Sequence, residues 1–307
     1  MDVEFWIVVL SGALALSVPV VLAAVGEIFL ERTGGFNVGI EGMMLVGAAC
    51  GVIGSAWGGF WVGLSAGVLA GAVLGILLGL ATVYGGADIV IIGIAIGLAG
   101  TALSTFFYQL LAPGGGTNTT APVQPPLNAP WLESIPVVGP ILDRAGLLFF
   151  ITIGLVLLAW LVLSQTRFGV RIRAVGDDDA LAATRGVRVD RYRIATAVIA
   201  GAFAGLGGAA VPLANIGTFT PGMTGGAGFI ALAVVIIGRG NPLGALGGAL
   251  LFAFFDRLAI LAQTQGLGLP LELYQALPYV VTLLILCLAA AQRTALARRR
   301  ALAAAGT

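Results

Sequence analysis

The sequence predicts an all-α integral membrane protein, and three observations carry the prediction. Hydrophobic residues make up 59% of the 307 residues and charged residues only 9%, whereas soluble domains carry about 25% charged residues. The hydrophobic residues gather in runs of the length that a helix needs to cross a bilayer. The alternating polar and apolar segments of an outer-membrane barrel are absent. We therefore expect one transmembrane domain over residues 1–307.

About nine apolar runs, with boundaries that allow eight to ten, follow one another at 5–25, 36–56, 60–82, 88–111, 145–164, 193–213, 227–238, 243–262 and 272–291. The run 227–238 is short, so we expect it to be tilted and buried or to share a crossing with its neighbours. Nine crossings place loop 166–192, the turns with Arg32 and Arg239, and the basic tail 292–307 on one side, which the positive-inside rule makes cytoplasmic. The N-terminus is then outside and the C-terminus cytoplasmic.

The segment 112–144 is a long polar connection on the opposite side of the predicted membrane. It contains seven prolines and three consecutive glycines. This composition is typical of a partly ordered extracytoplasmic loop rather than of a folded domain.

Glycine recurs at every fourth position of the run 60–82, at Gly63, Gly67, Gly71, Gly75 and Gly79. This spacing opens a groove on one helix face for a neighbouring backbone, either inside the subunit or in a second subunit. A fainter pattern is that Thr33-Gly34-Gly35 and Thr224-Gly225-Gly226 each precede an apolar run. Membrane proteins with duplicated halves show such echoes, although chance explains a similarity this short equally well.

Two residue types are missing, and their absence excludes whole classes of chemistry. The chain has no histidine and no lysine, so all fifteen basic residues are arginine. A Walker A loop needs its lysine on the phosphates, and histidine-based catalysis or metal ligation needs a histidine. We expect no catalytic residue, no metal and no cofactor in this chain. We interpret Cys50 and Cys287 as small buried hydrophobic residues rather than as a disulfide.

Loop 166–192, extended to Arg193, holds seven of the fifteen arginines, so it lies in water between two spans. In its middle a short capped helix is predicted, and such a helix is a docking element for a cytoplasmic partner. Its residues are Asp177 as the N-cap, Asp178 and Asp179 at the positive end, Arg185 at the other end, and Gly186 as the stop.

Glu41 lies several residues inside an apolar run, with Asn37 on the same helical face. An ionisable group at that depth costs roughly 2.5 kcal/mol or more unless it is paired or faces a cavity. Glu41 and Asn37 therefore either bind their neighbours and hold the fold, or line a polar path. Glu27, Glu31 and Arg32 precede them, and we interpret these three as a charged interfacial turn with local pairing.

Four stretches in order, at 26–48, 87–107, 171–193 and 228–252, resemble the permease subunits of ABC importers. The closest match is the nucleoside and simple-sugar branch of the branched-chain amino acid and sugar permease superfamily. The resemblance implies that the segment from Asp177 to Gly186 is the coupling helix that docks in the ATPase, with Ala182 and Ala183 giving the close approach.

The resemblance also implies which residues lie on the substrate pathway: Asn37, Glu41, Gly93, Gly97 and Phe229. The chain departs from the family at Gly97, where an asparagine is common, and at Ala227, where an arginine is common. These departures imply a different substrate contact, or recognition by a companion permease.

The implied partners are cytoplasmic ABC ATPase subunits, which bind ATP and Mg, a second related permease, and an extracytoplasmic substrate-binding lipoprotein. The expected substrate is a small polar solute: nucleosides first, then simple sugars, then branched-chain amino acids. The resemblance places the chain in a bacterial inner membrane as a multi-pass protein, with no nucleic-acid partner. The rival interpretation is a secondary carrier driven by an ion gradient. Such a carrier would need several acidic residues within the membrane, and the sequence offers few besides Glu41.

Overall fold

The computed structural model describes residues 3–116, 119–127, 138–264 and 280. Every regular element within this part of the chain is helical. In chain order the elements are α1 (Val3–Glu31), α2 (Ile40–Gly58), α3 (Phe60–Val83), α4 (Ile89–Leu111), the 3₁₀ turn η1 (Pro113–Gly116), α6 (Val138–Ala145), α7 (Leu147–Gln165), α8 (Arg167–Asp177), α9 (Asp179–Thr184), α10 (Val189–Asn215), α11 (Ala227–Gly238) and α12 (Pro242–Thr264).

The first eight predicted apolar runs each correspond to one helix. Seven of the described helices are long and apolar enough to cross a membrane, and α11 is the short apolar helix that the run 227–238 predicts. The ninth run, 272–291, and the tail 292–307 lie outside the described residues. The nine crossings and the sidedness of the termini therefore remain predictions.

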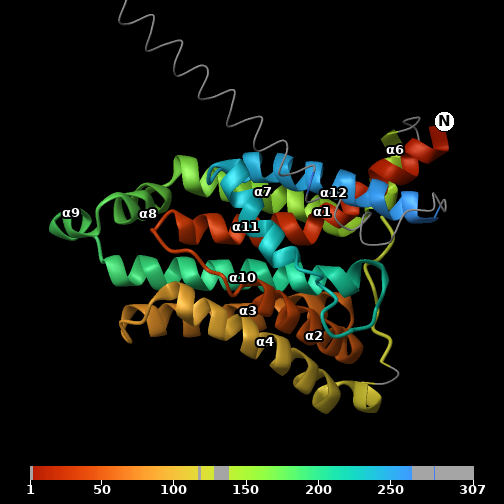
Figure 1. Ribbon diagram of the computed structural model, residues 1–307, viewed down its shortest axis with the longest axis horizontal. Helices are drawn as coiled ribbons and strands as arrows, with labels where there is room; N and C mark the ends of the chain where they lie inside the picture. Colours follow the sequence, from red (N-terminus) through yellow and green to blue (C-terminus); the bar gives the residue numbers. More distant parts are fainter. Residues whose placement is uncertain (1–2, 117–118, 128–137, 265–279, 281–307) are drawn as a thin grey trace, which may run out of the picture.

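The long helices lie lengthwise beside one another (Figure 1). Helix α1 packs against α7, α10, α11 and α12, while α2 packs against α3, α4 and α10. Two hydrophobic clusters fill the space between these helices, and their least exposed large side chains include Ile28, Met43 and Met44 in one and Leu22 and Leu213 in the other. Burial of large apolar side chains from three elements holds these helices together.

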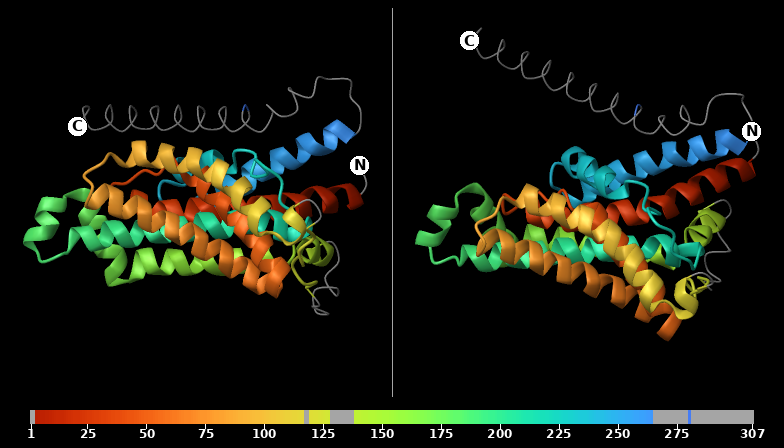
Figure 2. Two further views of the ribbon diagram at one scale, coloured as in Figure 1. Left: turned by 90° about the horizontal axis from the view of Figure 1, so that it is seen from below. Right: turned by 60° about the horizontal axis from the view of Figure 1, so that its bottom comes forward.

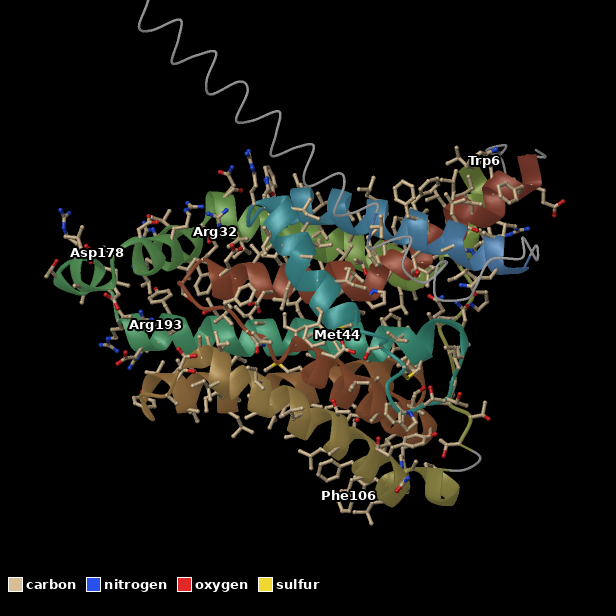
Figure 3. All side chains as sticks on the ribbon, in the orientation of Figure 1. Trp6, Arg32, Met44, Phe106, Asp178 and Arg193 are labelled. Atoms are coloured by element: carbon tan, nitrogen blue, oxygen red, sulfur yellow. The ribbon has the colours of Figure 1, made fainter. Side chains whose placement is uncertain are left out.

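The arginine-bearing turns gather at one end of the bundle, which we call the arginine end. Arg32, Arg173 and Arg239 line a common pocket there, beside α8 and α9. Figure 3 shows Arg32 and Asp178 at this end and Trp6 at the other. The turned views in Figure 2 place the start of α1 near the described end of α12, away from α9. This grouping is the one that the charge distribution predicts.

The glycine stripe of α3 packs inside the subunit, so the first of its two interpretations is confirmed. All five stripe glycines are buried. A Cβ atom at Gly71 would overlap the carbonyl oxygen of Gly201 in α10, and a Cβ at Gly67 would lie 3.0 Å from the Gly205 oxygen. Only glycine lets the α3 and α10 backbones approach this closely.

Two helices begin inside the bundle rather than at its end. After α1 the chain turns at 32–34, continues without regular structure to a second turn at 38–39, and begins α2 at Ile40. Helix α11 begins at Ala227, about halfway along the bundle, and returns toward the arginine end (Figure 1). A Cβ at Gly228 would lie 2.6 Å from the Glu41 nitrogen, so the two helix starts are in contact.

Candidate functional site

Glu41 joins the start of α2 to the start of α11. Its Oε1 accepts hydrogen bonds from Thr224 Oγ1 at 2.5 Å and from the Gly226 nitrogen at 3.0 Å, and its Oε2 accepts one from the Gly228 nitrogen at 2.8 Å. These N–H groups belong to the start of a helix, where backbone donors lack intrahelical partners and the dipole is positive. The interpretation of Glu41 as a residue that holds the fold accounts for all three bonds.

Asn37 is fully buried, and its polar atoms contact α1, α2 and the segment between them. Its Oδ1 accepts from the Gly39 nitrogen at 2.8 Å, and its Nδ2 lies 3.4 Å from Met43 Sδ. Its backbone nitrogen donates to Glu27 Oε1 at 2.7 Å. Asn37 therefore shapes the backbone that leads into α2.

The interpretation of Glu27 as part of an interfacial turn is wrong. Helix α1 continues to Glu31, six residues beyond the predicted end of the first run, and Glu27 is 0% exposed inside it. A buried polar backbone group needs a hydrogen-bond partner, and Glu27 provides it for Asn37. Arg32 bonds carbonyl oxygens of the turn after α11 rather than a local acid.

Helix α4 packs through glycines on the start of α2, beside the contact between α2 and α11. A Cβ at Gly39 would overlap the carbonyl oxygen of Gly93, and a Cβ at Gly42 would lie 2.7 Å from Gly97 Cα. Gly97 itself has room, because a Cβ there would meet only Gly39 Cα, at 3.7 Å. The structure thus accommodates a Cβ atom at Gly97, the position at which the resemblance implies an asparagine in relatives.

All five residues predicted for the pathway, Asn37, Glu41, Gly93, Gly97 and Phe229, belong to this junction of α2, α4 and α11. Phe229, in the first turn of α11, is 54% exposed, whereas Asn37 is closed off. Phe229 is therefore the exposed large side chain of the set. No contact in the described residues tests whether the pathway lies here, so the pathway role stays a prediction.

The loop after α7 forms two helices rather than one. Asp178, not Asp177, is the N-cap of α9, and its Oδ1 accepts from the Leu181 nitrogen at 2.8 Å. The prediction for Asp177 is wrong because α8 runs through that residue. Asp179 lies in the first turn of α9 and pairs with Arg193 at 2.9 Å.

The end of α9 is as predicted. Gly186 follows the helix with φ +79°, a conformation that favours glycine and ends helices. Ala182 is buried, whereas Ala183 and Arg185 are exposed. Helix α9 therefore presents short side chains and a charged end to its surroundings.

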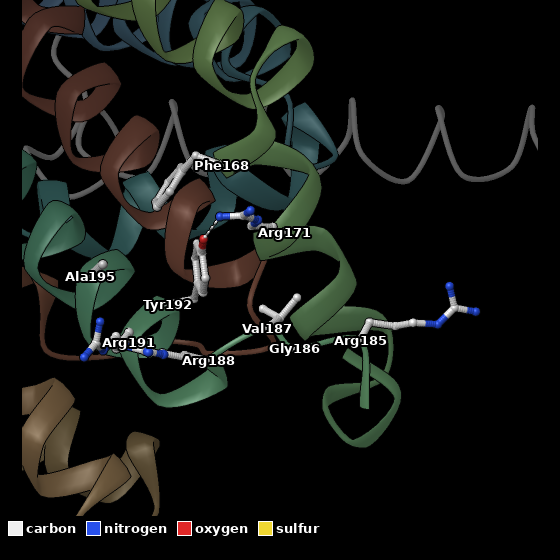
Figure 4. A pocket seen from close by; sticks show the side chains of 9 residues that line it. All are labelled: Phe168, Arg171, Arg185, Gly186, Val187, Arg188, Arg191, Tyr192 and Ala195. Carbon is white, nitrogen blue, oxygen red and sulfur yellow. Dashed lines mark hydrogen bonds between the residues drawn. The ribbon is translucent and has the colours of Figure 1, made fainter. Parts of the chain in front are cut away.

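A cavity of about 490 Å³ lies between α8, the turn after α9 and the start of α10, and four arginines line it (Figure 4). They are Arg171, Arg185, Arg188 and Arg191. Arg171 Nη1 donates to Tyr192 Oη at 2.9 Å, and Figure 4 shows Arg185 pointing away from that pair. Among the described residues the ion pair is Arg193 with Asp179, so none of these four arginines is paired with an acid there and the cavity is positively charged. Such a surface attracts acidic groups.

Among the described residues, no cluster of three or more acidic or cysteine side chains could hold a metal ion.

Comparisons with known proteins place the chain among membrane permeases. The family model described as the permease component of branched-chain amino acid transport systems matches residues 9–286. A nucleoside ABC transporter permease protein of Lactococcus lactis is 36% identical, and a guanosine ABC transporter permease protein of Bacillus subtilis is 32% identical, each over 92% of both chains. A putative glucose ABC transporter permease protein of Haloferax volcanii is 32% identical over 85% of this chain and 79% of its own. No solved structure matches.

Proposed function

The chain belongs to the family of permease components of branched-chain amino acid transport systems, and from this premise we propose that it imports nucleosides as one subunit of an ABC importer. The observation that carries the substrate is the pair of relatives named for nucleoside and guanosine transport, which align over 92% of both chains. The second candidate substrate is a simple sugar, which the relative named for glucose supports.

The permease needs partners for energy and for substrate delivery. We propose that cytoplasmic ATPase subunits bind ATP and Mg and dock on α9, that a second related permease completes the pathway, and that a lipoprotein delivers substrate from outside. In this arrangement the arginine end faces the cytoplasm of a bacterial cell. Two features of the loop support the docking site. Helix α9 is exposed except at Ala182, and the positively charged cavity beside the turn after α9 suits acidic groups of an ATPase.

The junction of α2, α4 and α11 is the proposed substrate pathway. Phe229 offers an exposed ring face, and stacking of a base on an aromatic ring contributes about 1–3 kcal/mol. Gly39 and Gly42 let Gly93 and Gly97 of α4 come close to the start of α2, and we propose that the pathway wall at this level is backbone. Asn37 and Glu41 act on the solute indirectly, because their polar atoms hold the helix starts in place.

The test is uptake into proteoliposomes that contain the complete importer, with ATP enclosed on the side of the ATPase. We expect ATP-dependent uptake of radiolabelled guanosine that excess unlabelled nucleoside suppresses and excess glucose does not. Suppression by glucose and not by unlabelled nucleoside would favour a simple sugar as the substrate. Guanosine uptake by this chain alone under an ion gradient, without ATP, would mean a secondary carrier and would refute the proposal.

A variant pair tests the pathway assignment. Phe229→Ala should raise the KM for guanosine uptake about 5- to 150-fold, the factor that corresponds to the loss of one stacking contact. Ile236→Ala is the matched control, because Ile236 lies on the same helix and is similarly exposed, at 61% against 54%. Equal KM values for the two variants would remove Phe229 from the pathway.

A further inference from the structure

Helix α11 is held at its two ends by two charged residues, Glu41 in the first turn of α2 and Arg32 just after α1. The helix has 12 residues, about 18 Å at 1.5 Å per residue, which is too short for a bilayer core of about 30 Å. Its first N–H groups therefore lie inside the protein and need partners there, and Glu41 accepts hydrogen bonds from Gly226 and Gly228 at that end. At the other end Arg32 binds the carbonyl oxygens of Arg239 and Gly240, in the turn that follows the helix.

The contacts of Arg32 are as specific as those of Glu41. Its Nη2 donates to the carbonyl oxygen of Gly240 at 2.7 Å and to that of Arg239 at 3.5 Å, and its Nε donates to Gly240 at 3.2 Å. Arg239 caps α11 with φ +56°, the one positive φ of a non-glycine residue among those described. A cation at the C-terminus and an anion at the N-terminus both complement the helix dipole.

Arg32 is also where α8 contacts this segment. A Cβ at Gly176 of α8 would overlap the carbonyl oxygen of Arg32 and would lie 3.3 Å from the Gly34 nitrogen. Arg173 and Asp177 of α8 line one pocket with Arg32. Backbone packed this closely transmits displacement, because neither side has a flexible side chain that can yield.

We propose that Arg32 and Glu41 are positioning residues that make α11 move together with α8. A shift of α8 displaces the Arg32 backbone, on which Gly176 packs. The Arg32 guanidinium then moves the turn that follows α11, to which it is hydrogen-bonded, while Glu41 holds the start of α11 on α2. The start of α11, about halfway along the bundle (Figure 1), thereby follows the loop that the ATPase engages. The inference rests on the proposed function and adds to it the mechanical link between docking loop and pathway.

Distance measurements between spin labels test the link without altering the two residues. In the complete importer, with Cys50 and Cys287 replaced by serine, labels are placed in pairs at exposed positions: Val170→Cys in α8, Ile236→Cys in α11 and Leu69→Cys in α3. On trapping with a non-hydrolysable ATP analogue, we expect the distances from Leu69 to both other labels to change while the Val170 to Ile236 distance stays constant.

Two results would overturn the proposal. Movement of Val170 relative to Leu69 without movement of Ile236 would show that α11 does not follow α8. A fixed distance between Val170 and Leu69 would remove the displacement that the link is meant to transmit. Because these labels leave Arg32 and Glu41 intact, the measurement decides the question even if variants at those residues do not fold.

Variants of Arg32 give a functional readout of the same link. Arg32→Met should leave ATP hydrolysis near the wild-type rate and lower guanosine taken up per ATP by about three- to thirty-fold, the usual size of a coupling effect. Arg32→Lys, which keeps the charge, should restore part of the ratio. Arg144→Met, at an exposed arginine of α6 near the opposite end, is the matched control and should match the wild type.

The two proposals fail in different ways. A wild-type importer that takes up no guanosine refutes the proposed function. A wild-type importer that transports, beside an Arg32→Met variant with an unchanged ratio of uptake to hydrolysis, refutes only the link through Arg32.

Discussion

Replacing Gly71 with alanine should push α3 and α10 apart, because both helices are in backbone contact at that level. The added Cβ would overlap the Gly201 carbonyl oxygen and would lie 2.8 Å from both the Cα and the nitrogen of Gly205. Ordinary contact begins near 3.4 Å, and backbone atoms cannot turn aside as a side chain can. The helices therefore have to separate along a contact that continues into the neighbouring turns.

Overpacking of this kind costs about 1–3 kcal/mol of folding free energy. Alanine gains up to about 1 kcal/mol over glycine in helix propensity, which offsets part of the loss. We expect Gly71→Ala to lower the free energy of unfolding by about 1–2 kcal/mol. Gly154→Ala in α7 is the matched control, since the same methyl group there meets nothing within 4 Å. It should be neutral or slightly stabilising.

The measurement is reversible unfolding in mixed micelles, with increasing sodium dodecyl sulfate and tryptophan fluorescence as the signal. The difference between the two variants is the informative quantity, because it cancels the effect of alanine on helix propensity. Equal unfolding free energies for Gly71→Ala and Gly154→Ala would refute the argument that glycine permits this approach.

Two further predictions concern the capping of α9 and the segment before α2. Asp178→Ala should destabilise α9 by about 1 kcal/mol and weaken copurification of the ATPase, whereas Asp177→Ala should leave copurification near wild type, because only Asp178 caps α9. Glu27→Ala should cost about 1–3 kcal/mol in the unfolding assay, because it leaves the buried Asn37 nitrogen without an acceptor. Glu27→Gln keeps an acceptor oxygen and should cost less; a larger cost for Glu27→Gln would contradict this account.

The spans were predictable because hydropathy is a local property of the chain. The run 227–238 coincides with α11, and 60–82 falls one residue short of the end of α3. The predicted end of the first run, at residue 25, was wrong, because a glutamate at position 27 is typical of the edge of a membrane segment. Its acceptor role depends on a backbone nitrogen ten residues later, in a turn whose shape the sequence does not reveal. The N-cap of α9 was misplaced by one residue, because consecutive aspartates offer equal capping groups and only the end of α8 decides between them.

The candidate site was predictable in part, for a related reason. Depth in an apolar run was enough to single out Glu41, but its partners follow it by more than 180 residues. One of those partners is Thr224, in the second of the two Thr-Gly-Gly stretches, which the sequence alone could not distinguish from a chance similarity. Arg32 was missed as a partner of α11, because an arginine next to two glutamates suggests a local ion pair.

An ionisable residue deep in a membrane segment is usually interpreted as a substrate or ion contact. Short helices that begin inside a membrane protein create a second need, since lipid offers no partner for their terminal N–H and C=O groups. Glu41 meets that need by accepting two bonds from backbone N–H groups at the start of α11, and it accepts a third from the Thr224 hydroxyl. Loss of uptake in a Glu41 variant would therefore not by itself identify a substrate contact. The distinction requires uptake per ATP, which a displaced α11 lowers, beside the KM for guanosine, which a lost contact raises.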